Sequence, residues 1–347
     1  MSSDIPEELA AYLTVKLTIV YPIASLSAVY FVYGFYGLLF GTSIYMMRNR
    51  HKVHGKNNRF YLLLTVALFI LVTIFVVVDT ADMIRDTIFR FNTVETGNYL
   101  PFLGYLRNDT AKTASYFLII AVPILLNFTA DCMLLHRCYV LWRPRKLVGL
   151  LLVAILFIVT AIGIVGAVII TIGARNTSIE SNRSLIDLGN KIDFANNVAA
   201  VVFNSLLTLS TAGRIIWIHR QVRSRGIHTT DNFMSPVTRI VLESGLLYPI
   251  STIAALIVSG NFVSIPFDLT PIPVFAAGIA PTLIIVRAQL GKNIESLQEA
   301  ASDARFTSHI APQEEFSFRS QAQVHSVVRF EDRNEEPMNG RKEEVLV

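Results

Sequence analysis

Apolar residues occur along this chain in seven blocks that are separated by short polar segments. Each block has about 20 residues, the length that crosses a bilayer as an α-helix. We therefore predict an all-α fold, a seven-helix transmembrane bundle over residues 24–290. The predicted spans are Ala24–Met47, Phe60–Thr80, Thr113–Leu135, Leu147–Ile172, Asn196–Ile218, Thr238–Gly260 and Pro271–Leu290.

The distribution of charge along the chain predicts how this bundle lies in the membrane. Charged residues are only 16% of the chain and hydrophobic residues 52%. The segments after the first, third and fifth spans are rich in Lys and Arg, which favours the cytoplasmic side. This places the N-terminus outside and the C-terminus in the cytoplasm. N-glycosylation sequons in segments placed outside agree with this orientation, and they lie at Asn108, Asn176 and Asn182.

Three further segments complete the predicted organisation. Residues 1–23 are a short extracellular N-terminus. Residues 291–306 can form an amphipathic helix along the inner membrane surface, because Ile294, Leu297 and Ala301 fall on one side of it. Residues 307–347 are polar and are expected to form a disordered cytoplasmic tail.

Small residues and prolines inside the spans predict packing and bending. Gly34, Gly37 and Gly41 would allow close approach of another helix, within the bundle or in a dimer. Pro123, Pro249 and Pro281 each remove a backbone hydrogen bond and can kink their helices.

Ionisable residues inside the spans are the candidate functional residues. A charge within a membrane span usually faces the bundle interior and finds a partner. The predicted orientation puts six such residues at similar depth near the cytoplasmic side: Asp131, His136, Arg137, Arg214, Glu243 and Arg287. We expect an ionic cluster in which Arg137 or Arg214 pairs with Glu243, while Asp131 reaches Arg287 or a neighbouring amide. The alternative is that the arginines extend to lipid head groups.

Polar residues also gather towards the outer side. Asp79, Asp82, Arg85 and Asp86 follow one another where the second predicted span ends, and the outer half of the fifth contains Asn196, Asn197 and Asn204. These residues could line an external pocket, or Asp82 to Asp86 form a solvated helix end.

Two resemblances rest on particular motifs. The segments DCMLLHRCYVLW, ESGLLY and APTLIIVRAQLG resemble a large family of seven-span proteins of mushroom-forming fungi, from the first span through Gly291. The ending HRCYVLWRP is similar to that of rhodopsin-class G-protein-coupled receptors, with Arg137 and Pro144 at the matching spacing. The chain departs from the receptor pattern at His136, at Cys138, and at Ala280 in the seventh span.

These features favour a receptor-like protein of the plasma membrane that senses an external small molecule or lipid and signals to a cytoplasmic protein. The alternative is a transporter or lipid-handling membrane protein, and a scaffold without ligand is a third reading. We find no nucleophile motif, no phosphate-binding glycine loop and no histidine–carboxylate constellation in the spans. We therefore expect no enzymatic activity, no cofactor, no metal and no nucleic-acid partner; the lipid bilayer is the expected surrounding.

Overall fold

A computed structural model describes residues 14–49, 56–142, 146–176, 179–224, 242–261, 267–287 and 290. The chain divides into two units, Met1–Leu297 and Gln298–Val347, and all described residues belong to the first. The predicted juxtamembrane helix at 291–306 and the predicted tail at 307–347 lie outside the described residues, as does most of the predicted external N-terminus.

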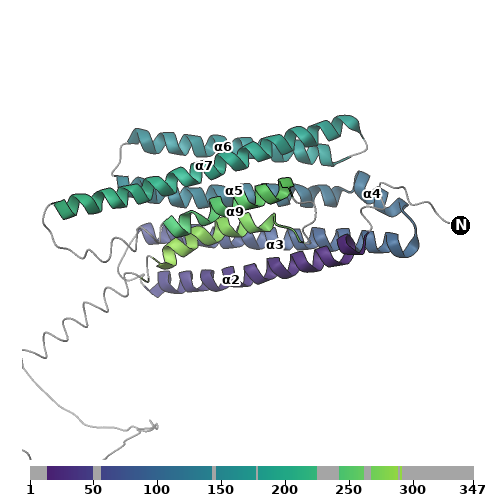
Figure 1. Ribbon diagram of the computed structural model, residues 1–347, viewed down its shortest axis with the longest axis horizontal. Coiled ribbons are helices and arrows are strands. Elements are labelled where there is room, and N and C mark those ends of the chain that lie inside the picture. The colour runs from purple at the N-terminus through teal and green to yellow at the C-terminus, as the bar shows by residue number, and fades with distance from the viewer. Residues whose placement is uncertain are drawn as a thin grey trace, which may run out of the picture. The chain divides into compact units, whose positions relative to one another are not determined.

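The described residues are almost all helical and include no strand, which confirms the predicted all-α class. A π-helical turn at Lys16–Val20 leads into α2 (Tyr21–Asn49). The further labelled helices are α3 (Lys56–Thr96), α4 (Leu100–Asn108), α5 (Thr110–Trp142), α6 (Lys146–Ala174), α7 (Glu180–Ser224) and α9 (Leu247–Asn261) (Figure 1). An additional apolar helix covers Pro271–Arg287.

Five of these helices are long and apolar enough to cross a bilayer. They are the segments Lys16–Arg48, Arg59–Thr96, Thr110–Val140, Gly149–Ala174 and Glu180–Ile218. Helices also occur where the sixth and seventh spans were predicted, but they are shorter, at Leu242–Val258 and Pro271–Arg287. These apolar helices fit a multi-pass membrane protein in a lipid bilayer.

Two helices continue well beyond the predicted spans, because no helix-breaking residue stops them. α3 ends only at Gly97, whose φ of 66° is the left-handed conformation common just after a helix. α7 includes most of the segment between residues 176 and 196, which lies between the fourth and fifth predicted spans. The short helix α4 was not predicted either; it starts beside Pro101, with the Asn98 side chain accepting a hydrogen bond from Leu100 N at 3.1 Å.

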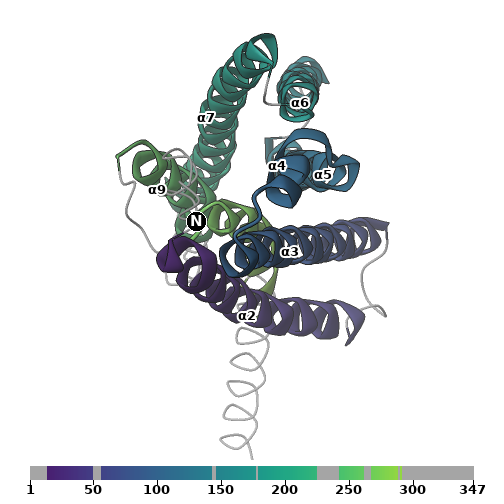
Figure 2. The ribbon, with the colours of Figure 1, turned by 90° about the vertical axis from the view of Figure 1, so that its right-hand side faces the viewer.

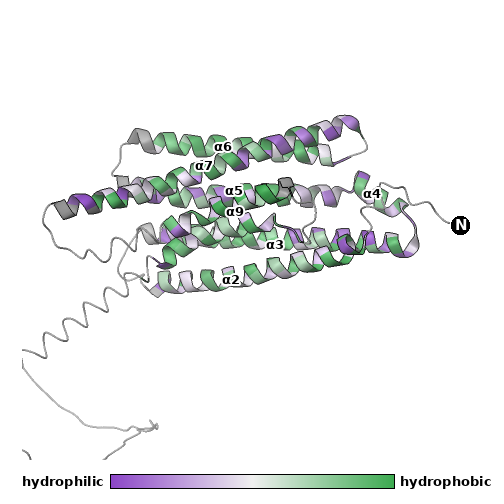
Figure 3. Ribbon diagram, in the orientation of Figure 1, coloured by the Kyte–Doolittle hydropathy of each residue, from purple (hydrophilic) through white to green (hydrophobic). Residues whose placement is uncertain are grey.

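Neighbouring helices in the sequence pack side by side in the order α2, α3, α5, α6 and α7, and Figure 2 shows α5 between α3 and α6. Large side chains at the centre are fully buried, among them Tyr36, Phe75, Leu126 and Phe275. Many apolar side chains point outward instead, for example Phe31 at 80% exposure and Leu150 at 68%. Figure 3 shows hydrophobic residues along the middle of the helices and polar residues along the outer part of α7. An apolar outer surface of this kind suits contact with lipid.

Glycine brings helices together, but not at the glycines that the sequence analysis selected. A Cβ atom at Gly189 of α7 would lie 2.3 Å from Ile170 Cγ1 of α6, and one at Gly173 would lie 2.7 Å from the Asn182 carbonyl oxygen. Within the described chain nothing lies within 4 Å of a Cβ built at Gly34, Gly37 or Gly41. We predicted that another helix of the bundle packs closely on these three glycines, but no described helix does so.

The three prolines differ in their surroundings. α5 continues through Pro123. Helical hydrogen bonds continue past Leu246, three residues before Pro249: Leu246 N donates to Leu242 O at 2.9 Å, and Ile250 N donates to Leu246 O at 3.0 Å. Pro281 lies buried within the Pro271–Arg287 helix.

Candidate functional site

Tyr61 of α3 contacts two of the predicted site residues of α5. Its hydroxyl lies 2.9 Å from His136 Nδ1. The Arg137 guanidinium carbon lies 5.3 Å from the centre of the Tyr61 ring, a cation–π distance. The neighbouring Phe60 ring is 4.7 Å from the His136 ring, centre to centre. These contacts join α3 to α5 at the inner end, which is the end that the charge pattern predicts to face the cytoplasm.

Glu243 and Arg287 form a second inner-end contact, between the two short apolar helices. Arg287 Nη1 lies 3.2 Å from Glu243 Oε2, and the side chains are 39% and 48% exposed. An ion pair with this exposure contributes at most about 1 kcal/mol in water. It is therefore a weak link that a rearrangement of these helices can break.

Asp131 lies deeper than the other predicted residues and contacts an amide. Asn204 Nδ2 of α7 donates a hydrogen bond of 2.9 Å to Asp131 Oδ1, and both residues are buried. Asp131 precedes Val140, the inner limit of that candidate span, by nine residues, about 14 Å along a helix axis. Its hydrogen bond is to Asn204, whereas Arg287 pairs with Glu243.

The structure thus divides the predicted six-residue cluster into several contacts. Glu243 pairs with Arg287. We had predicted Arg137 or Arg214 as the partner of Glu243, and Arg287 as one possible partner of Asp131. Asp131 bonds to an amide, which was the other choice. The Arg214 guanidinium carbon lies 4.1 Å from the centre of the Trp217 ring on the same helix. Tyr61 was missed, because the sequence alone does not reveal which face of α3 meets α5.

At the outer end, α3, α4 and α5 are joined by charges. Arg85 Nη2 lies 2.6 Å from Asp109 Oδ2, and Tyr105 has two cations over its ring, Arg85 at 5.8 Å and Lys112 at 5.1 Å. Burial raises the pKa of the Tyr105 hydroxyl, and the carboxylate of Asp82 raises it further. Residues 82 to 86 therefore lie inside a packed, continuous helix rather than at a solvated helix end.

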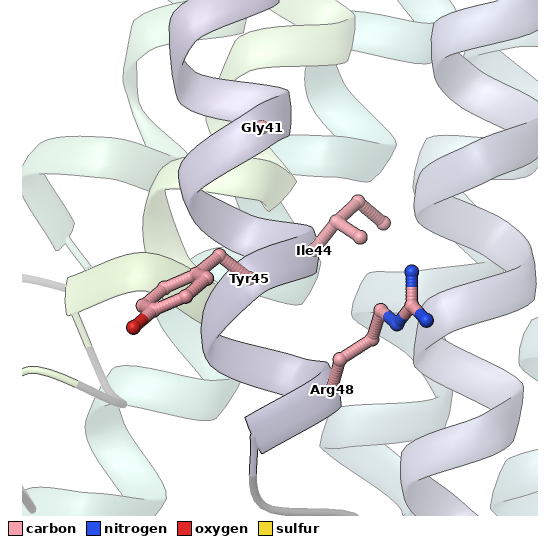
Figure 4. Close-up of a pocket in the computed structure, with 4 residues that line it drawn as sticks. All are labelled: Gly41, Ile44, Tyr45 and Arg48. Atoms are coloured by element: carbon pink, nitrogen blue, oxygen red, sulfur yellow. The ribbon is translucent and has the colours of Figure 1, made fainter. Parts of the chain in front are cut away.

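A hollow of about 460 Å³ lies on α2 near its inner end, lined by Gly41, Ile44, Tyr45 and Arg48 (Figure 4). Tyr45 is 71% exposed and extends from the opposite side of the helix to Arg48. All four residues come from one helix, so the hollow is a surface feature of α2 and not a chamber between the helices.

The predicted glycosylation sites lie around the outer ends of α4 and α7. Asn108 is the last residue of α4. Asn176 precedes α7, and its carbonyl accepts a 2.8 Å hydrogen bond from Asn182 Nδ2 in the first turns of that helix. The amide nitrogen that would carry a glycan at Asn182 is therefore engaged in a backbone contact.

No protein-family model, curated protein or solved structure matches the chain.

Proposed function

We propose that this chain is a receptor-like protein of the plasma membrane, with seven spans, an external N-terminus and a cytoplasmic C-terminus. It would sense an external small molecule or lipid and signal to a cytoplasmic protein. The observation that supports this proposal best is the contact of Tyr61 with His136 and Arg137, because it joins two long helices at the end that would face such a partner. The resemblances to the fungal seven-span family and to rhodopsin-class receptors belong to the same proposal.

Seven spans require that the two short apolar helices also cross the membrane. Residues 242–258 and 271–287 are 17 each, about 25 Å of helix, which is at the lower limit for crossing a bilayer. Their Glu243 and Arg287 side chains then lie together at the inner end. The sequons at Asn108, Asn176 and Asn182 lie on the outer side of this arrangement and are proposed to carry glycans.

The inner-end contacts suit a switch between two states. A hydrogen bond contributes about 1 kcal/mol and an exposed ion pair less than that. An external ligand that binds one arrangement of the outer helix ends more tightly by a few kcal/mol would therefore outweigh them. The basic segments beside these contacts, including Arg48 to Arg59, would then become available to a cytoplasmic protein.

A transporter or lipid-handling protein is the second candidate. The buried Asp131–Asn204 pair favours it, because ionisable residues inside membrane spans often mark substrate or ion pathways.

Distances between paired spin labels at both ends of the bundle distinguish the two candidates. The inner pair is Arg59→Cys with Arg220→Cys, and the outer pair is Asn92→Cys with Asn190→Cys; all four residues are exposed. Both pairs are made in a Cys132→Ser, Cys138→Ser background, since the chain has only these two cysteines. Tyr61→Phe with Glu243→Gln then removes the hydrogen bond to His136 and the charge attraction between Glu243 and Arg287.

A receptor predicts a longer inner distance with an unchanged outer distance. A transporter with alternating access predicts a longer inner distance together with a shorter outer one. Unchanged distances at both ends would contradict the role of the inner contacts in holding a resting state.

A further inference from the structure

Asp131 is a buried carboxylate without a cationic partner among the described residues. It is 5% exposed, and its side-chain contact is the amide of Asn204. Among the described residues, no Lys, Arg or His side chain forms an ion pair with it. An ionised carboxylate inside a bundle is costly unless another group neutralises it. One bound positive charge would therefore neutralise this carboxylate.

Two further buried oxygen atoms, on the face of α7 that contacts Asp131, have no hydrogen-bond partner among the described residues. Asn204 Oδ1 is one of them, and it belongs to the amide whose nitrogen already contacts the carboxylate. Thr208 Oγ1 is another, one helical turn further along the same face of α7. Asn204 and Thr208 are 4% and 1% exposed. Buried polar atoms in proteins rarely remain unpaired, so these oxygens call for a partner.

The helix that contains Pro249 brings a third element against this face of α7. A Cβ atom at Gly245 would lie 2.5 Å from Thr208 Cγ2 and 2.8 Å from Thr208 Oγ1, so the backbone of this segment lies directly against α7. The preceding Ser244 is 2% exposed, and its hydroxyl also lacks a partner among the described residues. Pro249 has no N–H, so the Gly245 carbonyl lacks its usual helical donor.

We propose that Asp131, Asn204, Thr208 and the Ser244–Gly245 segment bind a monovalent alkali cation between α5, α7 and the Leu242–Val258 helix. Hard cations take carboxylate, carbonyl and amide oxygens as ligands, which are the atoms gathered here. One carboxylate balances one positive charge, whereas a divalent ion would leave a net charge buried in the bundle. A backbone carbonyl that lacks its helical N–H donor, as that of Gly245 does before Pro249, can serve as a further oxygen ligand. The proposal does not depend on whether the protein is a receptor.

The test uses the purified full chain in lipid nanodiscs at neutral pH. Its thermal unfolding midpoint is measured in NaCl, in KCl and in choline chloride at the same ionic strength. A bound alkali cation raises the midpoint with increasing concentration, because it binds only the folded protein. We expect a rise in NaCl, KCl or both, relative to choline chloride, and the more effective salt identifies the preferred cation.

Variants connect this effect to the site. Asp131→Asn removes the one full charge and is expected to abolish the salt-specific rise. Thr208→Val keeps the shape of the side chain and is expected to lower the apparent affinity by about tenfold, the equivalent of one modest contact. Asp187→Asn makes the same chemical change at an exposed position of α7 and is expected to leave the rise intact.

Three results would overturn the proposal. The first is the same midpoint in choline chloride as in both alkali salts. The second is an unchanged rise in Asp131→Asn, or in Thr208→Val if Asp131→Asn does not fold. The third is a response to Ca²⁺ with none to Na⁺ or K⁺, which would contradict the monovalent charge.

Discussion

The side-chain amide of Asn204 donates a 2.9 Å hydrogen bond to the Asp131 carboxylate and so joins α7 to α5 inside two candidate spans. A buried carboxylate that loses its donor pays the full cost of its own desolvation. We therefore expect Asn204→Leu to lower the free energy of unfolding by about 3 kcal/mol. The measurement is thermal or denaturant unfolding in nanodiscs.

Asn197→Leu is the matched control for this prediction. Asn197 lies on the same helix and donates a 3.0 Å hydrogen bond to Asp193, one turn away and only partly buried. Its loss is expected to cost about 1 kcal/mol or less. If both variants lose the same free energy of unfolding, the burial of Asp131 does not increase the contribution of its hydrogen bond to stability.

Tyr61 offers a second prediction, because its hydroxyl and its ring make different contacts. Tyr61→Phe removes the hydrogen bond to His136 but keeps the ring beneath Arg137, and is expected to cost about 1 kcal/mol. Tyr61→Leu removes both contacts and should cost about 1 kcal/mol more. Tyr45→Phe, at a side chain that is 71% exposed, should change nothing. A Phe variant at position 61 as stable as the wild type would contradict the hydrogen bond.

Glycine-to-alanine substitutions test where the helices approach most closely. At Gly189 the new methyl group would lie 2.3 Å from Ile170 Cγ1 and 3.0 Å from the Ile170 backbone nitrogen, so we expect a loss of about 1–3 kcal/mol. At Gly37, with nothing within 4 Å in the described chain, the better helix propensity of alanine should stabilise by up to about 1 kcal/mol.

The two glycine variants are compared by unfolding of the monomeric protein. A loss at Gly37 as large as at Gly189 would mean that another molecule or an undescribed segment packs on α2. Size-exclusion chromatography with light scattering then decides whether that molecule is a second copy of the chain.

The hydrophobic pattern predicted the helices well and their ends poorly. Blocks of apolar residues locate the part of a helix that lies in lipid, but a helix continues until a residue stops it. α3 ends at Thr96, sixteen residues after Thr80, with Gly97 directly after it. The segment from Glu180 to Asp193 contains no proline, and α7 already begins at Glu180. Hydropathy thus predicts where the apolar helices lie, whereas the helix bounds depend on the residues at their ends.

The candidate site was predicted in its residue types but not in its pairings. Asp131 and Glu243 stood out because charges inside spans are rare. Their partners could not be assigned, since Asn204 and Tyr61 are ordinary residues in apolar helices and only the rotation of each helix brings them into contact. The glycines that pack tightly, Gly173 and Gly189, lack the spacing that drew attention to Gly37 and Gly41.

Asp109 has two roles that substitutions can separate. Its Oδ1 accepts hydrogen bonds from Ala111 N at 2.8 Å and Lys112 N at 3.1 Å at the start of α5, and its Oδ2 pairs with Arg85. Asp109→Asn keeps the cap and loses the charge, with an expected cost of about 1 kcal/mol or less. Asp109→Ala loses both, for about 1 kcal/mol more. Unfolding midpoints should therefore fall in the order wild type, Asn, Ala; an Asn variant as unstable as the Ala variant would contradict the capping role.

The central claim is that the chain crosses the membrane seven times, and it depends on the two short helices, Leu242–Val258 and Pro271–Arg287. The most direct measurement places one N-glycosylation cassette after Ser264, between these helices, in a background with Asn108, Asn176 and Asn182 changed to Gln. The same cassette after Gly226 is expected in the cytoplasm and serves as the negative control, and one after Thr177 is the positive control. Seven spans predict that the cassette after Ser264 is glycosylated, seen as a mass loss on enzymatic deglycosylation. Glycosylation after Thr177 but not after Ser264 would mean that only the five long helices cross the membrane, and would contradict the account.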